Sequence, residues 1–156
     1  MKKSLFSVII VLLVSVFAIP SVYASGGDFH ENTKEEIIYL ADGSYIVSTV
    51  TEEKANTSSY AAAQTKSGSK TSTVYSATGA SLYSITVHGT FSYNGSSATA
   101  KSSSYSHTEN SPLWSFSSGS ASVSGATATA SGTFKSALTT KTLTVSLSCS
   151  ASGTLS

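Results

Sequence analysis

Apolar and polar residues alternate strictly along much of the chain. Across 83–93 every second residue is apolar or glycine, and Ser, Thr or His fills the positions between them. A period of two predicts a β-strand with one buried and one solvated face. The Asn94-Gly95 pair that follows suits a two-residue hairpin turn, because both residues tolerate a positive φ. The pattern therefore predicts a hairpin over 82–106.

That turn also predicts a register for the hairpin. If Tyr93 pairs with Ser96, large and small residues face each other on one side of the sheet. The expected pairs are Phe91–Ala98 and Gly89–Ala100 on the apolar face, and His88–Lys101 on the polar face.

Other segments carry the same period. Residues 142–151 place Leu, Val, Cys and Ala on one face and Ser or Thr on the other. A third pair is predicted over 113–123 and 126–134, with a turn at Ser124-Gly125. The apolar parity changes within its first strand, which indicates a bulge near Ser118-Gly119.

The N-terminal part of the chain is less regular. Residues 37–40 and 45–50 flank an Asp42-Gly43 turn and form a further hairpin candidate, and 70–75 is another short strand. Residues 52–69 show neither period and are expected to be a linker or mobile loop. We therefore predict an N-terminal segment with a hairpin (25–51), this linker, and a β-sandwich over 70–156. The pattern leaves open whether the hairpin joins the sandwich.

The total of about seven to eight short strands, with turns at regular intervals, is typical of an antiparallel, immunoglobulin-like β-sandwich. Of the 132 residues from Ser25 onward, 32 are serine and 20 are threonine. Such a composition also occurs in disordered stalks. The strict alternation instead places these hydroxyl side chains on the solvated faces of strands.

The first residues have the layout of a secretory signal peptide. Two lysines precede an apolar run over 5–19, and Val22-Tyr23-Ala24 offers small residues at both positions that a signal peptidase reads. The alternative is a retained anchor, but a bilayer span needs about 20 apolar residues. We therefore expect removal of 1–24 by cleavage between Ala24 and Ser25. The product is expected to be secreted, extracellular or loosely associated with the cell wall.

Charge and cysteine content exclude several classes of protein. Charged residues make up 11% of the chain and the net charge is +1, so nothing in the charge favours binding to nucleic acid. The single cysteine, Cys149, excludes an intramolecular disulfide framework. Its place on the apolar face of the last strand predicts a buried, inert thiol and no disulfide-linked partner.

Catalytic chemistry has little support. After residue 53 the only acid is Glu109, and the chain contains no G-x-S-x-G motif. A match to S-x-x-K at 67–70 is expected by chance in a serine-rich chain. His30, His88 and His107 share no face at close spacing, so we expect no metal site and no cofactor. We predict that the protein is not an enzyme; a hydrolase that uses His88 or His107 is the least favoured hypothesis.

Two aromatic residues are weak candidates for ligand binding. Trp114, the only tryptophan, could stack on a sugar ring with help from Tyr105. The competing interpretation of Trp114, which its parity with Phe116 favours, is a core residue between two sheets.

Several of these features occur together in a known group. The run Tyr39–Val47 (YLADGSYIV), Asn94-Gly95, Trp114 and the closing Ser148–Gly153 (SCSASG) resemble an uncharacterised family of small secreted β-rich proteins of Gram-positive bacteria. The resemblance spans nearly all of the chain beyond the signal peptide and implies secretion and a β fold. It implies no catalytic or binding residue.

The favoured hypothesis is a secreted, non-enzymatic module that binds a cell-envelope polymer or a protein partner. The alternative is a membrane-active or pore-forming protein, because transmembrane β-hairpins also alternate apolar with polar residues. Against this alternative, the supposed lipid face of the strand after Asn94-Gly95 is only Ala98 and Ala100 before serines follow.

Overall fold

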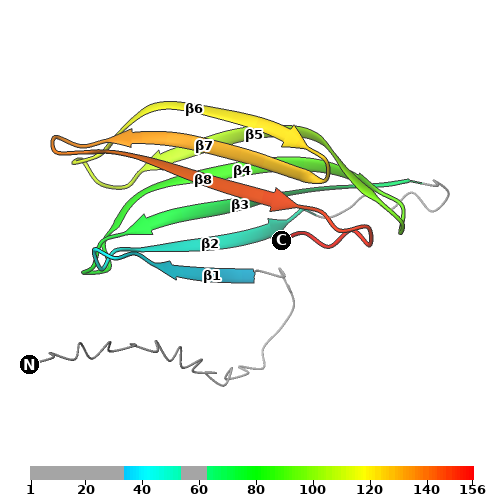
Figure 1. Ribbon diagram of the computed structural model, residues 1–156, viewed down its shortest axis with the longest axis horizontal. Coiled ribbons are helices and arrows are strands. Elements are labelled where there is room, and N and C mark those ends of the chain that lie inside the picture. Colours follow the sequence, from blue (N-terminus) through cyan, green and yellow to red (C-terminus); the bar gives the residue numbers. More distant parts are fainter. Residues whose placement is uncertain (1–33, 54–62) are drawn as a thin grey trace, which may run out of the picture.

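The computed structural model describes residues 34–53 and 63–156, which form eight antiparallel strands in two sheets (Figure 1). The prediction of a signal peptide at 1–24, with cleavage at Ala24-Ser25, lies outside the described residues. The strands are β1 (Lys34–Tyr39), β2 (Tyr45–Glu52), β3 (Gln64–Tyr75), β4 (Ser81–Tyr93), β5 (Ala98–Glu109), β6 (Ser115–Ser124), β7 (Thr127–Lys135) and β8 (Thr140–Ser148).

The strands follow a simple order. Strands β1 to β5 form one sheet and β6 to β8 form the other, and hydrogen-bonded neighbours in each sheet are consecutive in the sequence. The predicted β-sandwich is confirmed. The immunoglobulin-like connectivity is not, because that fold exchanges strands between its sheets in a Greek key. Strands that follow each other in the sequence are neighbours in both sheets, which makes two meanders instead, and the chain changes sheet between β5 and β6.

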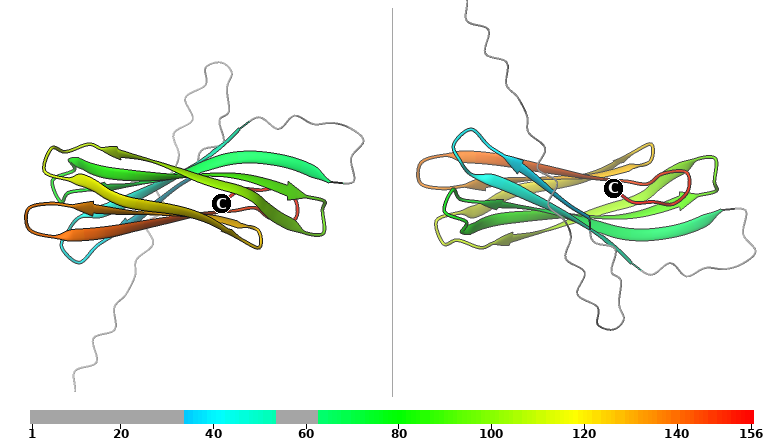
Figure 2. Two further views of the ribbon diagram at one scale, coloured as in Figure 1. Left: turned by 90° about the horizontal axis from the view of Figure 1, so that it is seen from above. Right: turned by 90° about the horizontal axis from the view of Figure 1, so that it is seen from below.

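The two sheets differ in width and overlap only in part. Strand β6 packs over β5, β7 over β4 and β5, and β8 over β3 and β4. Figure 2 shows the sheets as two layers, and in Figure 1 β1 and β2 extend beyond the edge of the three-stranded sheet. The core lies in the overlap. Its fully buried members are Ile85, Val87 and Phe91 on β4, and Ala128, Phe134 and Leu147 on β7 and β8.

The hairpin of β4 and β5 has the predicted faces along β4 and near the turn, but not the predicted register. Tyr93 pairs with Ala98 instead of Ser96, so the turn spans 94–97. The Asn94 side chain explains the difference, because its oxygen accepts hydrogen bonds from the amides of Ser96 and Ser97. Next to the turn the shift is by two residues, which preserves the face of each side chain there; beyond Thr90 it is by three, which reverses the face of the side chains on β5.

This shift changes the expected cross-strand pairs. A register irregularity after Thr90 adds one further residue on β5. His88 therefore lies opposite Ser104 and not Lys101, and Phe91 faces Ala100.

The remaining strands in the second half agree closely with the alternation. The bulge predicted near Ser118-Gly119 lies between Phe116 and Ser118. The inward residues of β8, Leu143, Val145 and Leu147, are buried. The interior is closely packed where glycine faces the opposite sheet: a Cβ at Gly132 would lie 2.7 Å from Ile85 Cδ1.

The N-terminal hairpin is part of the sandwich. Strand β2 pairs along its whole length with β3, so β1 is the edge of the five-stranded sheet. The linker was predicted to extend to residue 69, but β3 already begins at Gln64. Residues 54–62 of the predicted linker lie outside the described residues. The alternation fails over 64–72 because small or polar residues, Gly68 and Ser72, occupy buried inward positions.

The C-terminal residues fold back over the wider sheet. After β8, residues 149–156 turn at Gly153, and Leu155 returns to bridge Cys149. Leu155 is fully buried, and a Cβ at Gly68 would lie 2.4 Å from its Cδ1. The segment therefore covers part of β2 and β3 that the three-stranded sheet leaves open.

Candidate functional site

A cleft of about 260 Å³ opens at the end of the sandwich where the β1–β2 turn, the start of β4 and the start of β8 meet. Two aromatic side chains, Tyr83 and Trp114, form part of its wall. The remaining lining residues are Leu40, Ile46, Val74, Leu82 and Leu143, which are apolar, and Asp42, Ser44, Lys141 and Thr142, which are polar. The cleft thus combines an apolar wall with a carboxylate and an ammonium group.

Trp114 is positioned by the link between the sheets. The amides of Asn110 and Ser111 donate to the carbonyl of Leu82, and the Trp114 amide donates to the carbonyl of Ser111. The indole then packs on the Tyr83 ring, with centroids 4.6 Å apart and planes inclined by 51°. Trp114 is partly buried against the core and also lines the cleft. Trp114 therefore has contacts of both kinds: it packs against the core, and it lines a cleft where a ligand could stack on it.

Asp42 supplies the negative charge of the cleft. The hydroxyl and the amide of Ser44 both donate to its carboxylate oxygen. These two hydrogen bonds, with a smaller contribution from the Lys141 charge, lower the pKa of Asp42 below its ordinary value. The carboxyl group is therefore ionised at neutral pH and fixed at the β1–β2 turn.

Tyr83 supplies a phenol at the base of the cleft. Its side chain is 4% exposed, and it stacks on Phe134 with ring centroids 4.3 Å apart. Burial, and then the charge of Asp42, raise the pKa of Tyr83, so the hydroxyl keeps its proton at neutral pH. It is a donor available to a ligand in the cleft.

Tyr105, the second predicted site residue, lies elsewhere. It lies on β5, pairs with Val87 of β4 and packs over Gly119, where an added Cβ would lie 2.8 Å from its ring. Its ring centroid is 6.2 Å from that of Phe116. Tyr105 is not among the residues that line the cleft, so the structure does not bring it together with Trp114.

A group of tyrosines on the outer face of the wider sheet was missed by the sequence analysis. Tyr39, Tyr45 and Tyr75 lie directly opposite one another on β1, β2 and β3. The first two rings are 5.7 Å apart, and the second and third are stacked at 5.1 Å with planes 7° apart. Tyr39 and Tyr45 flank the Asp42-Gly43 turn symmetrically, which could have revealed their pairing. Tyr75 could be placed only once β2 was known to pair with β3.

The histidines and serines considered for metal binding or catalysis do not come together in one site. His30 lies outside the described residues, His88 bonds Ser106 on the outer face, and His107 stacks on Phe116 at 3.6 Å. In the S-x-x-K match, Ser67 bonds Thr90 on the outer face, whereas Lys70 approaches Glu36 at 3.8 Å on the inner face. Within the parts of the chain that the structure describes, no group of three or more His, Cys, Asp and Glu residues could hold a metal ion.

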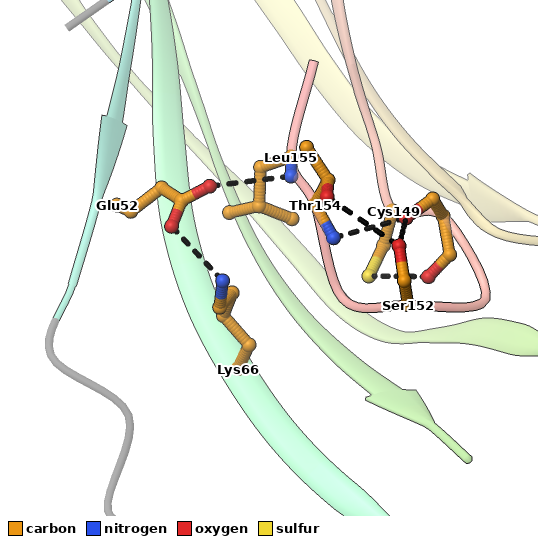
Figure 3. A network of polar contacts seen from close by, with 7 residues as sticks. Glu52, Lys66, Cys149, Ser152, Thr154 and Leu155 are labelled. Carbon is orange, nitrogen blue, oxygen red and sulfur yellow. Dashed lines mark hydrogen bonds and ion pairs between the residues drawn. The ribbon is translucent and has the colours of Figure 1, made fainter. Parts of the chain in front are cut away.

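Cys149 lies beneath the C-terminal segment (Figure 3). Its thiol is 5% exposed and donates to the carbonyl of Ser150. Burial raises the pKa of Cys149, so the thiolate is disfavoured. Beside it, Glu52 accepts hydrogen bonds from Lys66 and from the amide of Leu155. This arrangement holds the C-terminus against the sheet and is structural.

In comparisons with known proteins, no family model, curated protein or solved structure matches the chain. Among the described residues there is no helix long and apolar enough to cross a membrane.

Proposed function

We propose that the protein is a secreted, non-enzymatic binding module that takes a sugar unit of a cell-envelope polymer into the cleft beside Trp114. The observation that carries this proposal is the combination of an indole wall with Asp42, Lys141 and the Tyr83 hydroxyl around one small cavity. Apolar walls with a few fixed polar groups are the usual composition of a small-ligand site.

The chemistry of the cleft suits a sugar ring. The C–H face of the ring would pack against Trp114, and its hydroxyls would reach the carboxylate, the ammonium and the phenol. A volume of about 260 Å³ is just below the usual range of ligand sites, which favours one ring over a larger group. The opposite charges of Asp42 and Lys141 offset each other, so the site does not require a charged polymer.

Secretion and a Gram-positive origin are part of the same proposal. They are supported by the pattern of 1–24 and by the resemblance of YLADGSYIV, Trp114 and SCSASG to small secreted proteins. Fractionation of a producing culture tests them. Retention in the wall fraction, with release by wall digestion, is expected; recovery in the cytoplasm would contradict secretion.

Trp114 provides a direct test of binding, because it is the only tryptophan in the chain. Titration with soluble fragments of wall polysaccharide should change its fluorescence in a saturable way. Asp42→Asn and Lys141→Met should each weaken binding roughly tenfold, the effect of losing one charge-assisted hydrogen bond.

Lys101→Met is the matched control, since Lys101 is exposed on β5 and is not a cleft residue. This variant should bind as the parent does. An unchanged Trp114 emission up to millimolar fragment would contradict the proposal. Equal weakening by Lys101→Met would indicate non-specific attraction by surface lysines instead.

The membrane-active alternative gains no support from the arrangement of the strands. The apolar face of the β4–β5 hairpin is buried between the sheets, and Ile85, Val87 and Phe91 are fully inaccessible. Contact of this face with lipid would require the two sheets to separate. Release of dye from liposomes by the purified protein at neutral pH would favour that alternative.

A further inference from the structure

The cleft beside Trp114 holds two opposite charges that do not pair with each other. Asp42 comes from the β1–β2 turn of the wider sheet, and Lys141 comes from the start of β8 in the smaller sheet. None of the ion pairs in the described ranges includes either residue. After the hydrogen bonds from Ser44, the Lys141 charge nevertheless also lowers the pKa of Asp42. The two groups are therefore close enough to interact, yet a polar group of a ligand can lie between them.

The Asp42 carboxylate is oriented through one oxygen and offers the other. The amide and the hydroxyl of Ser44 both donate to Oδ1. Among the hydrogen bonds of the described residues, none reaches Oδ2. The turn therefore holds the carboxylate in place and presents Oδ2 as a strong acceptor to a donor on a ligand.

Lys141 occupies a position where the alternation of β8 would place an apolar side chain. It lies opposite Phe134 of β7 and two residues before Leu143, both of which are buried, so it points toward the space between the sheets. In the described chain, the lysines whose ammonium groups form hydrogen bonds or ion pairs are Lys66 and Lys70. The Lys141 ammonium is therefore available to an acceptor on a ligand.

The rest of the cleft is more apolar than a plain sugar requires. Trp114 accounts for one face of a ring. The wall also contains five aliphatic side chains, those of Leu40, Ile46, Val74, Leu82 and Leu143. The hydroxyls of a hexose would lose hydration against these side chains without gaining hydrogen bonds. A ligand that fits the whole cleft therefore carries a small apolar substituent as well.

We infer that the sugar unit in the cleft is an N-acetylated amino sugar whose acetamido group lies between Asp42 and Lys141, an inference that rests on the proposed function. The N–H and C=O groups of a trans amide point in opposite directions. The N–H donates to Oδ2 of Asp42, and the carbonyl accepts from Lys141. The methyl group packs against the aliphatic wall, and the ring remains on Trp114. One substituent thus matches three features of the cleft that a plain hexose leaves unmatched.

Charged ligands fit the same two groups less well. A zwitterion would have to bring two ions out of water, whereas an amide is neutral and costs less to transfer. An amino sugar without the acetyl group has an ammonium for Asp42, but it has no acceptor for Lys141, which repels it. The neutral acetamido group is therefore the better complement of the cleft.

Calorimetric titration of the purified protein with three sugar trimers of identical linkage tests the inference. The trimers are built from N-acetylglucosamine, glucosamine and glucose, and they differ only in one substituent on each ring. The N-acetylated trimer should bind at least about tenfold more tightly than either of the others, because it gains hydrogen bonds to two charged groups.

The possible failures of this titration are distinguishable. Equal binding of the N-acetylated and glucose trimers, or tighter binding of the glucosamine trimer, would overturn the inference and leave sugar binding in place. So would wall fragments that bind while the N-acetylated trimer does not. Absence of binding by all three trimers and by wall fragments would contradict the proposed function itself.

Variants of the two charged residues test the position of the acetamido group. Asp42→Asn keeps Oδ1 for Ser44 but replaces Oδ2 by a nitrogen that donates, so it opposes the ligand N–H. A glucose hydroxyl can accept as well as donate and is affected less. Lys141→Met removes the donor to the carbonyl and keeps an unbranched side chain. Each variant should reduce the preference for the N-acetylated trimer over the glucose trimer to below about threefold.

Lys135→Met is the matched control for these variants. Lys135 lies opposite Thr140 on β7, one step along the ladder from Lys141, but it is exposed and does not line the cleft. Its loss should leave the preference unchanged, and thermal unfolding shows whether each variant is folded. A preference that survives in both cleft variants, or that falls equally in Lys135→Met, would overturn the inference.

A last probe separates a sugar from a peptide. N-acetylalanine methylamide carries the same acetamido group without a ring to pack on Trp114. It should bind at least about tenfold more weakly than the N-acetylated trimer, because the stacking on the indole is lost. Binding as tight as that of the trimer would show that the cleft recognises peptide amides, and would overturn the inference.

Discussion

The three-stranded sheet and strand β1 meet solvent in opposite ways. In β7 and β8 the inward apolar residues are buried, and the outward serines and threonines form four hydrogen-bonded cross-strand pairs. In β1 all six residues are exposed, whichever way they point. The difference arises because a second sheet covers β7 and β8, whereas β1 lies beyond the overlap. Alternation predicts burial only where another layer is present.

The outer face of β7 and β8 and the exposed strand β1 are two different kinds of surface. The paired hydroxyls of β7 and β8 satisfy one another, so that face needs no partner. On β1 the side chains of Ile37, Ile38 and Tyr39 are exposed, because no second layer covers them. Stability should therefore depend on the overlap more than on the edge.

The largest expected effect comes from the centre of the overlap. Phe91→Ala removes a fully buried ring that packs beside Gly89 and Ala128. It should lower the free energy of unfolding by about 3–5 kcal/mol, as large-to-small core substitutions do. Urea unfolding followed by Trp114 fluorescence measures the change.

The matched substitution on the edge is Ile37→Ala. Because Ile37 is half exposed, its loss should cost below about 1 kcal/mol in the monomer. Comparable costs for the two variants, measured where the protein is monomeric, would show that β1 belongs to the core after all.

An intermediate effect is expected where the C-terminal segment meets the wide sheet (Figure 3). Burial would raise the pKa of Glu52, but the hydrogen bond and charge of Lys66 and the amide of Leu155 outweigh it and lower the pKa below 4.5. A lowered folded pKa stabilises the protein above the unfolded value, and this contribution is lost as pH falls through the folded pKa.

Glu52→Gln should therefore destabilise the protein by about 1.5 kcal/mol at pH 7, the typical worth of a hydrogen bond to a charged group. The difference from the parent should shrink at pH 3. Urea unfolding at both pH values measures it, with Glu35→Gln on exposed β1 as the control. A destabilisation that is the same at pH 3 and pH 7 would mean that the Glu52 charge is not involved.

Much of the fold could be predicted from the sequence, because the inward residues of β4, β7 and β8 alternate without interruption. Within these strands the register around Asn94 was wrong, since the pattern cannot reveal that the Asn94 side chain would cap the amides of Ser96 and Ser97. The first half of β3 was missed for another reason. Gly68 and Ser72 fill buried positions where Leu155 and Ser48 leave little room, so no apolar period marks the strand.

The candidate site was harder to predict. Trp114 could be singled out as a lone tryptophan, but Asp42, Tyr83 and Lys141 come from three distant segments. Only the packing of the β1–β2 turn against β4 and β8 brings them together. Tyr105 was misplaced because its position along β5 relative to Trp114 depends on the link between the sheets.

The smallest expected effect concerns the hydroxyl pairs. Thr129 and Ser146 lie opposite each other on the exposed face of β7 and β8, with oxygens 3.0 Å apart. Water can replace either partner there. A double-mutant cycle with Thr129→Val and Ser146→Ala should give a coupling energy of about 0.2–1 kcal/mol.

The buried pair Ser48–Ser72, at 2.8 Å on the inner face of β2 and β3, has the same chemistry with much less access to water. Ser72→Ala leaves the Ser48 hydroxyl unpaired and should cost about 1–3 kcal/mol. A coupling energy for Thr129–Ser146 as large as this cost would mean that the outer hydroxyls act as a cooperative network, and that the hydroxyl face contributes to stability as the overlap does.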